Sequence, residues 1–439
     1  MKHCTLIIVL GAAWMAAAPA AGQDSASVWT LERCMRHARE NSLEVRQNQL
    51  SIESAGEDLR QAKAAFAPSV SASTSQNFSY SPVLDNPSFG YSANYSIGLS
   101  MTLVDGGKMY FTKKQAQLNQ ACKEQGLLTT RKEMDMSILQ AYLQALYSRE
   151  AINTAERGVE LDKEALDRAN ILFAAGKITK ADRAQVESQY SQSRADLISA
   201  GNNLQSALLT LKQLLELPID NDFRIDYPDI SDAEVMTPLP DMMDVYRRAM
   251  ETMPQVKEAE MEKEYARLGV KAARSGWYPT LSFSASAGGS YNTLQEPSLG
   301  DQFKSNFGPS AGFTLSIPIY DRSQTRAAVN KAEISERQAD LGVQQAEKTI
   351  SKYVESLYID AKSAQANFQA ALDKLAYAEE SYKLVSEQFR VGLKNTVEML
   401  TERQNLISAE QSLSQSRYQT VISIQLLNLL RDEPVSIGQ

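Results

Sequence analysis

The chain has 439 residues, with 45 Lys and Arg against 53 Asp and Glu and a formal net charge of −8 at pH 7. An acidic chain without an obvious basic patch is a poor ligand for nucleic acid, so we exclude that class of partner. His37 is the only histidine beyond the first 22 residues, and no catalytic triad, phosphate loop or metal-ligand cluster is visible. We therefore expect no enzyme activity, no cofactor and no metal, with His37 on the surface of a helix.

Residues 1–22 have the pattern of a secretory signal peptide. Lys2 and His3 supply the basic start, an apolar run covers 6–18, and small residues precede Gln23. That run is too short to cross a bilayer as an anchor. We expect a mature chain that begins at Gln23.

Two cysteines remain in the mature chain. The helical rise places Cys34 about 50 Å before Pro68 and Cys122 about 25 Å after Asp105, at levels that do not meet. A disulfide needs much closer Cα atoms, so we expect two free thiols. Neither Cys4 nor Cys34 has the context of a lipid-acceptor cysteine, and we expect no lipid anchor.

The first half of the chain begins with a helical pattern over 30–67, which ends before Pro68 because proline disfavours a helical residue ahead of it. The hydrophobic period then changes to two. Residues 69–80 and 91–103 alternate apolar side chains with Ser, Asn, Gly and Thr, and a turn rich in Pro, Asp and Asn lies between them. This pattern predicts a hairpin of two strands.

A long helix is expected over 107–173, capped by Asp105 and about 100 Å in length. A turn around Gly176 and a return helix over 180–216 follow. Residues 217–240 are rich in Pro and Asp and show no period, which is typical of a linker.

The second half repeats this order. Apolar residues over 354–389 recur at alternating gaps of three and four, as in the seam of a coiled coil. The same spacing recurs 216 residues earlier, over 138–173, and only Ser148 and Asp162 break it. A helix used twice at one spacing predicts an internal duplication. The expected division is a first repeat over 23–216 (hairpin 69–103), a linker over 217–240, a second repeat over 241–432 (helix to Tyr278, hairpin 280–319 with a loop over 292–306, long helix 323–389, return helix 396–431) and a tail over 433–439.

The four strands suit a membrane. Strands of about 9–11 residues span an outer membrane when tilted, with lipid-facing and lumen-facing side chains alternating. The polar faces carry small uncharged residues, whereas a soluble sheet usually places Lys and Glu on its wet face. Aromatic residues expected to form interfacial girdles are Phe78, Tyr80, Tyr91, Trp277, Tyr278 and Tyr291. The alternative is a soluble hairpin in a periplasmic coiled-coil adaptor or scaffold protein.

Four strands cannot close a barrel, and an open edge in lipid leaves backbone groups unpaired. Several copies are therefore needed to seal one sheet. A dimer would give eight strands and a filled bore, and a trimer would give twelve strands and a pore.

Two short motifs accompany the duplicated order of elements: residues 29–32 (Trp-Thr-Leu-Glu) at the start of the first helix and residues 389–393 (Phe-Arg-Val-Gly-Leu) at the second turn. In these features the chain resembles the TolC family of outer-membrane efflux proteins. The resemblance implies a mainly α fold with a transmembrane β-barrel: a homotrimer with a twelve-stranded barrel in the outer membrane of a Gram-negative bacterium and a twelve-helix α-barrel in the periplasm. It further implies an exit duct for efflux or type I secretion, which works with a periplasmic adaptor and an inner-membrane transporter and contacts outer-membrane lipid.

In that family the tip of the second hairpin receives the adaptor. Val391, Gly392 and Leu393 match the expected tip fully, whereas the first tip matches only at Gly176. The resemblance thus implies adaptor contact at these four residues. The exported substrate cannot be read from the sequence, since a bore lined by Ser recognises no chemical group.

The resemblance also implies a periplasmic gate formed by Asp182, Phe389, Lys394 and Glu398. Thr401 departs from the family's acidic residue and removes one carboxylate per subunit from the constriction. The same residues fit a second interpretation, because Thr179 with Asp182 and Asn395 with Glu398 have the spacing of capping boxes. Both roles stay open from the sequence.

Overall fold

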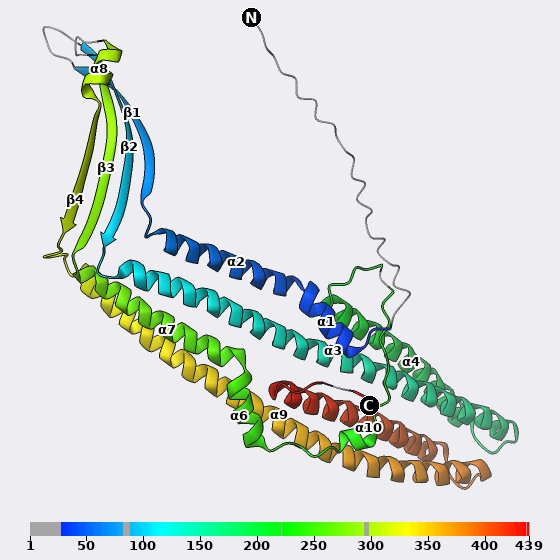
Figure 1. Ribbon diagram of the computed structural model, residues 1–439. Coiled ribbons are helices and arrows are strands. Elements are labelled where there is room, and N and C mark those ends of the chain that lie inside the picture. The colour runs from blue at the N-terminus through cyan, green and yellow to red at the C-terminus, as the bar shows by residue number, and fades with distance from the viewer. Residues whose placement is uncertain (1–27, 82–87, 221, 294–297, 436, 439) are drawn as a thin grey trace, which may run out of the picture.

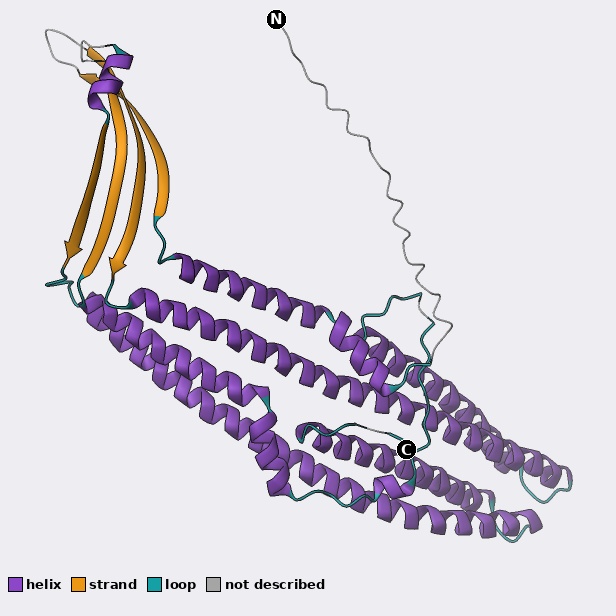
Figure 2. Ribbon diagram, viewed as in Figure 1, coloured by secondary structure: helices purple, strands orange, loops and turns teal. Residues whose placement is uncertain are grey.

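The computed structural model describes residues 28–81, 88–220, 222–293, 298–435 and 437–438, so the expected signal peptide lies outside the described residues. Figures 1 and 2 show a curved four-stranded sheet at one end of a long helical body. This arrangement confirms the expected fold of a mainly helical chain with one four-stranded sheet.

The first repeat follows the expected order of elements. It comprises α1 (Leu31–Asn41), α2 (Leu43–Ala64), β1 (Ser69–Ser81), β2 (Ser88–Val104), α3 (Lys108–Ala174) and α4 (Lys180–Leu214). The single helix expected over 30–67 is wrong, because Ser42 has an extended ψ of 137° and interrupts it. The Ser42 hydroxyl accepts a hydrogen bond from the backbone N–H of Glu44 at 3.2 Å and so begins a new helix.

The second repeat has the same order with three departures. It comprises α6 (Met242–Thr252), α7 (Pro254–Arg274), the 3₁₀ turn η1 (Ser275–Trp277), β3 (Thr280–Asn292), α8 (Leu299–Asn306), β4 (Gly308–Ser316), α9 (Gln324–Val391) and α10 (Thr396–Leu430), while the short helix α5 (Asp232–Val235) lies in the preceding linker. The helix expected to run on to Tyr278 is divided before Pro254, which disfavours a helical Met253. The expected loop 292–306 contains α8, capped by Ser298. The last strand ends at Ser316, short of the expected residue 319 and ahead of Pro318, which has no N–H to donate.

The sheet joins the two repeats edge to edge. Its order is β1-β2-β3-β4, with every neighbouring pair antiparallel. The central pair brings Ser92 opposite Asn292 and Met101 opposite Phe283. The outer edges of β1 and β4 have no strand beside them within the described chain.

Each long helix is lined by two shorter ones in succession. Helices α2 and α4 pack along α3, and α7 and α10 pack along α9. The seam positions Val354, Leu357 and Phe368 of α9 are buried as the heptad spacing predicts. The two polar residues that break the seam in α3, Ser148 and Asp162, are buried as well.

The middle of the bundle is held by the linker and by the end of α10. The backbone N–H of Trp29 donates to the carbonyl of Arg224 at 2.8 Å, and the hydroxyl of Tyr142 donates to the carbonyl of Asp226 at 2.8 Å. His37 is half-buried and packs edge-on against Trp29 with ring centroids 5.1 Å apart, so its expected surface exposure is wrong. This burial lowers the pKa of His37.

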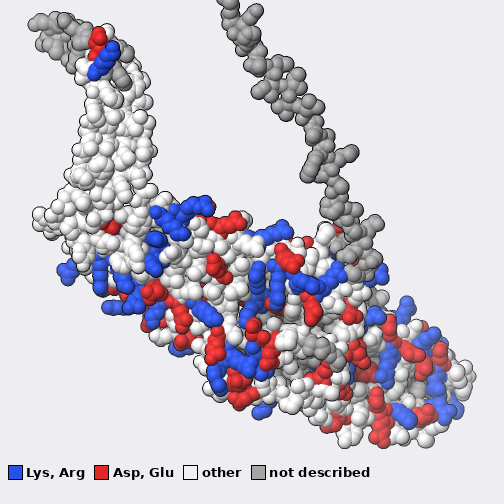
Figure 3. Space-filling view, viewed as in Figure 1, with Lys and Arg blue, Asp and Glu red and all other residues white. Residues whose placement is uncertain are grey.

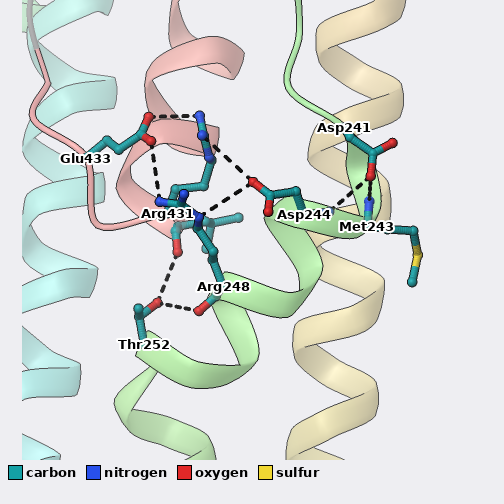
Figure 4. A network of polar contacts seen from close by, with 8 residues as sticks. Asp241, Met243, Asp244, Arg248, Thr252, Arg431 and Glu433 are labelled. Atoms are coloured by element: carbon teal, nitrogen blue, oxygen red, sulfur yellow. Dashed lines mark hydrogen bonds and ion pairs between the residues drawn. The ribbon is translucent and has the colours of Figure 1, made fainter.

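Figure 4 shows how the end of α10 is fastened to α6. Arg431 forms ion pairs with Glu433 at 2.8 Å and with Asp244 at 3.9 Å. The Thr252 hydroxyl donates to the carbonyl of Leu430 at 3.2 Å. These contacts fix the height at which the return helix ends, about halfway along the bundle.

Cys34 and Cys122 are free, as predicted, and the structure shows that both are buried. Burial raises the pKa of Cys34 to about 12 and that of Cys122 to about 11. Both thiols are therefore protonated and unreactive at neutral pH.

No helix in the described part of the chain is long and apolar enough to cross a membrane.

Candidate functional site

The two helical hairpins end in tips at the end of the molecule opposite the sheet (Figure 1). We define the first tip as residues 173–182 and the second tip as residues 389–398. In the first tip, Gly176 has a φ of +70°, its N–H donates to the carbonyl of Phe173 at 2.9 Å, and the N–H of Lys177 donates to the carbonyl of Leu172 at 2.9 Å. This pair of bonds is the Schellman ending of a helix, which places glycine in the left-handed region.

The second tip has the same ending. Gly392 has a φ of +82°, its N–H donates to the carbonyl of Phe389 at 3.1 Å, and the N–H of Leu393 donates to the carbonyl of Gln388 at 2.9 Å. The duplication seen in the seam thus extends to the hydrogen bonds of the turns.

Both acidic tip residues cap the return helices. Asp182 accepts a hydrogen bond from the backbone N–H of Thr179 at 3.0 Å, and the Thr179 hydroxyl accepts from the N–H of Asp182 at 3.1 Å. Glu398 and Asn395 repeat this reciprocal pair at 3.1 and 2.9 Å. The capping-box interpretation is therefore confirmed for both tips.

Lys394 adds a further bond to the second tip. Its Nζ donates to Oε1 of Glu398 at 2.6 Å, so one carboxylate binds both a cation and a backbone N–H. These hydrogen bonds, the one from Lys394 above all, lower the pKa of Glu398. Hydrogen bonds from Thr179 lower the pKa of Asp182. Thr401 donates its hydroxyl to the carbonyl of Val397 at 2.8 Å.

The aromatic residues of the two tips differ. Phe389 is only 3% exposed and packs with Leu172, Val186 and Met399 in a small core that joins both hairpins. Its counterpart Phe173 is 36% exposed, and the guanidinium of Arg183 lies over its ring at 5.4 Å. Within one subunit, Phe389 thus holds the hairpins together and is not presented at the surface.

The second tip exposes apolar side chains. Val391 is 55% exposed and Leu393 is 77% exposed. At Gly176 and Gly392, an added Cβ would meet no atom within 4 Å, so both turns are open to a partner. Solvent-exposed apolar residues at a hairpin end are typical of a docking surface.

A groove not expected from the sequence lies between α4 and α10 near these tips. Its volume is about 590 Å³. The lining residues are Gln185, Ser188, Gln189, Gln192, Val397, Leu400, Thr401, Gln404 and Asn405. Uncharged amides and hydroxyls dominate it, so it offers hydrogen bonds without fixed charge.

A buried ion pair joins the two hairpins above the tips. Nη2 of Arg403 on α10 lies 2.6 Å from Oδ2 of Asp162 on α3, and the two side chains are 5% and 1% exposed. Arg403 also donates to the carbonyl of Gly158 at 3.3 Å. Burial raises the pKa of Asp162, and the positive charge of Arg403 opposes this rise.

A second pair lies next to the first. Arg157 contacts the largely buried Glu410 of α10 at 2.9 Å and Glu379 of α9 at 3.7 Å. Asp162, a polar residue at a seam position of α3, therefore forms a charged link between the two repeats. The broken seam was the signal in the sequence, but Arg403 lies 241 residues away and the seam pattern did not identify it.

The sheet carries the other feature expected from the sequence. No charged residue occurs in β1, β2, β3 or β4. At the end of the sheet far from the helices, ring centroids lie 5.0 Å apart for Phe78 and Tyr91 and 6.1 Å apart for Tyr91 and Tyr291.

Tyr80 extends this aromatic group, because its ring centroid lies 4.8 Å from that of Phe89. Phe89 was not among the predicted aromatics, since β2 begins at Ser88 and the expected strand began at residue 91. At the helix end of the sheet, Trp277 and Tyr278 are 52% and 58% exposed. The six predicted aromatics thus lie at the two ends of an uncharged sheet.

Comparisons with known proteins agree with these features. The protein-family model described as "Outer membrane efflux protein" matches residues 35–216 and 245–430 of this chain. The chain is 23% identical over 402 residues to the outer membrane efflux protein BepC of Brucella suis biovar 1 (strain 1330), covering 91% of this chain and 84% of that protein. It is 21% identical over 410 residues to the outer membrane protein TolC of Escherichia coli (strain K12), covering 90% and 80%.

The fold is similar to a crystal structure of CusC, with a TM-score of 0.81 at 17% identity over 92% of each chain. The family match covers both repeats and most of the chain. It favours a transport protein over an enzyme or a soluble adaptor. This chain belongs to the outer membrane efflux protein family, the family of TolC.

Proposed function

We propose that three copies of the chain form one channel, with twelve strands closing a barrel in the outer membrane. The observation that carries this proposal is the pair of open edges on β1 and β4 of a sheet whose strands hold no charge. In lipid, unpaired edge groups are too costly to persist, so each edge needs a neighbouring copy. Twelve strands enclose a bore wide enough for water, whereas eight would be filled by side chains.

The helices continue the channel into the periplasm. Helices α3 and α9 have 67 and 68 residues, which correspond to about 100 Å each. With α2 and α4 stacked along one and α7 and α10 along the other, each subunit supplies a wall four helices wide. Three such walls form a twelve-helix α-barrel.

The channel is the exit duct of a tripartite efflux or type I secretion system. A periplasmic adaptor docks on the tips and links them to an inner-membrane transporter. The exposed Val391 and Leu393, the open turns at Gly176 and Gly392, and the uncharged groove between α4 and α10 support this docking surface. Selectivity for cargo belongs to the transporter, since the polar faces of the strands carry only small uncharged groups.

The tips also form the periplasmic gate. Lys394 and Glu398 supply the charged contacts of the gate. Asp182 caps the return helix at the first tip, and Phe389 keeps the two hairpins of one subunit packed together. In this assignment capping and gating are compatible, because the bonds that start the return helices also hold the charged groups in place.

Two experiments test this function. Purified protein in planar bilayers should conduct ions, and the double variant Lys394→Ala with Glu398→Ala should raise the resting single-channel conductance. Glu398→Gln is the matched control for capping, because its amide oxygen can still accept from Asn395 while its charge is lost. Unchanged conductance in both variants would remove the gate assignment.

The second experiment identifies the partners. A photo-crosslinker at Leu393 should capture an adaptor and, through it, an inner-membrane transporter, whereas the same group at Ile219 should not. Ile219 is 98% exposed in the linker and serves as an apolar control away from the tips. Equal capture at both positions would contradict docking at the tip.

A further inference from the structure

The region where the helices meet the sheet is strongly basic. We define the basic collar as residues 60–68, 105–116, 267–279 and 317–331, which flank the four strands on the helix side. The collar contains eleven of the chain's 45 Lys and Arg residues but only two acidic residues, in a chain of net charge −8. Its basic residues are Arg60, Lys63, Lys108, Lys113, Lys114, Arg267, Lys271, Arg274, Arg322, Arg326 and Lys331.

The two acidic residues of the collar are engaged by helix ends. Asp105 accepts hydrogen bonds from the backbone N–H groups of Gly107 at 3.1 Å and Met109 at 2.8 Å. Asp321 accepts from the N–H of Thr325 at 2.7 Å. Neither carboxylate is paired with a collar Lys or Arg among the described residues, so the basic excess is not neutralised from within.

Three of the basic residues have acidic neighbours. Arg60 pairs with Glu57 at 2.6 Å, Arg267 with Glu264 at 3.3 Å, and Arg274 with Glu333 at 2.8 Å. Among the residues that the structure describes, the other eight form no ion pair, and all of these except Lys113 are exposed. The collar therefore presents a surplus of cations to its surroundings.

The position of this surplus is informative. Figure 3 shows basic side chains at the helix ends directly beside the uncharged surface of the sheet, while farther along the helices both signs are mixed. At the opposite end of the sheet, the charged residues in the described chain are Asp301 and Lys304, one of each sign. A uniformly solvated helical surface would not place such an excess of one sign at the boundary with an uncharged sheet.

Aromatic residues accompany the cations. Trp277 and Tyr278 lie within one collar segment, and the ammonium of Lys113 lies 6.0 Å from the ring centroid of Phe66. Aromatic rings mixed with Lys and Arg are typical of the level where a bilayer changes from hydrocarbon to headgroups.

We propose that the basic collar binds the phosphate groups of anionic phospholipids in the leaflet that faces the helices. This inference rests on the proposed placement of the sheet in a membrane. Lys and Arg at an anionic surface attract its headgroups over about one Debye length, so the binding weakens with salt. The collar thereby sets the depth of the channel and enriches anionic lipid around it.

Trp277 offers a direct test, because it lies in the collar, whereas Trp29 is buried in the middle of the bundle. The assembled mature protein, which begins at Gln23 and so lacks Trp14, is reconstituted in phosphatidylcholine vesicles that contain a minor fraction of brominated phosphatidylglycerol or, in the parallel arm, brominated phosphatidylcholine. Bromine quenches tryptophan only at short range. Quenching by brominated phosphatidylglycerol should exceed that by brominated phosphatidylcholine about twofold or more, and high salt should remove the difference.

Two variants make the test specific. Changing Lys63, Lys114, Lys271, Arg326 and Lys331 to Gln should make the two brominated lipids quench equally. A matched control changes the exposed Lys163, Arg168, Lys348, Lys352 and Lys362 to Gln, away from the collar, and should keep the preference.

Equal quenching by the two lipids in the unchanged protein would overturn the inference, as would a collar variant that keeps the preference. Absence of quenching by either lipid would have a different meaning, because it would remove the sheet from the bilayer and contradict the proposed function itself.

Discussion

Arg403 of α10 lies 2.6 Å from Asp162 of α3, and the pair is almost completely buried between the two helical hairpins. A buried ion pair contributes little net stability against an apolar pair of the same size, but losing one partner leaves a charge without compensation. The contact therefore fixes one relative height of the hairpins, and through them of the two tips.

The first prediction concerns this pair. Arg403→Met should lower the free energy of unfolding by about 3–5 kcal/mol, because Asp162 is then buried without its cation. Circular dichroism of the helices during heating would show the loss as a lower melting midpoint. The double variant Arg403→Met with Asp162→Leu should recover most of the lost stability. Equal melting midpoints for Arg403→Met and the parent would contradict the role assigned to the ion pair.

Gly158 provides an independent probe of the same contact. A Cβ added there would lie 3.0 Å from Nη2 of Arg403, so the missing side chain makes room for the guanidinium. Gly→Ala within a helix ordinarily stabilises by about 1 kcal/mol. We expect Gly158→Ala to lower the melting midpoint, whereas Gly201→Ala, which has open space around it, should raise it. A rise in both variants would show that the Arg403 position is not restricted.

The tips should respond to acid in a defined direction. Hydrogen bonds from Lys394 and Asn395 lower the pKa of Glu398 in the folded state. A carboxyl with a lowered pKa stabilises the fold above its ordinary pKa and loses that contribution as the pH falls through the lowered value. We expect Glu398→Ala to increase deuterium uptake in residues 393–402 at neutral pH.

The difference in uptake between Glu398→Ala and the parent should vanish once the pH falls below the lowered pKa of Glu398, where the parent carboxyl is protonated too. Comparing the two proteins at each pH removes the intrinsic pH dependence of exchange. A difference that grew with acid would reverse the predicted sign.

Gly106 should tolerate no side chain. Its φ is +66°, and an added Cβ would lie 2.7 Å from Cβ of Tyr278 and 2.9 Å from the carbonyl oxygen of Ser275. Gly106→Ala should therefore cost at least about 2 kcal/mol from backbone strain and from displacement of β2 against η1. The yield of folded protein and its melting midpoint measure this cost. Gly300→Ala in α8, where nothing lies within 4 Å, is the control that should lower neither the yield nor the midpoint.

Much of this architecture follows from hydrophobic periods. The three-four spacing over 354–389 predicted the buried seam of α9, and alternation over 69–80 and 91–103 predicted β1 and β2. These elements are long and bury one face, so their period outweighs local exceptions.

Where the observed elements differ from the predicted ones, the causes are local, and a hydrophobic period does not reveal them. Pro254 was a visible signal for the division between α6 and α7, and Ser298 three residues before Asp301 was a visible capping signal for α8. Ser42 is a weaker signal, since it has the residue type of an N-cap but neither a neighbouring proline nor an acidic residue three positions later.

The roles of the functional residues also differ in whether local sequence spacing predicts them. The capping of Asp182 and Glu398 is local and was readable from spacing. The burial of Phe389 against Leu172 and Met399, and the partner of Asp162, depend on how two repeats pack, and a single sequence does not encode these contacts at a readable spacing.

The central claim is that each sheet is completed only by neighbouring copies. Native mass spectrometry of the mature protein in detergent measures the number of chains in the assembly directly. The open edges of β1 and β4 and the need for a water-filled bore predict three chains per particle. A particle of one chain, or of two, would contradict the twelve-stranded barrel and with it the proposed channel.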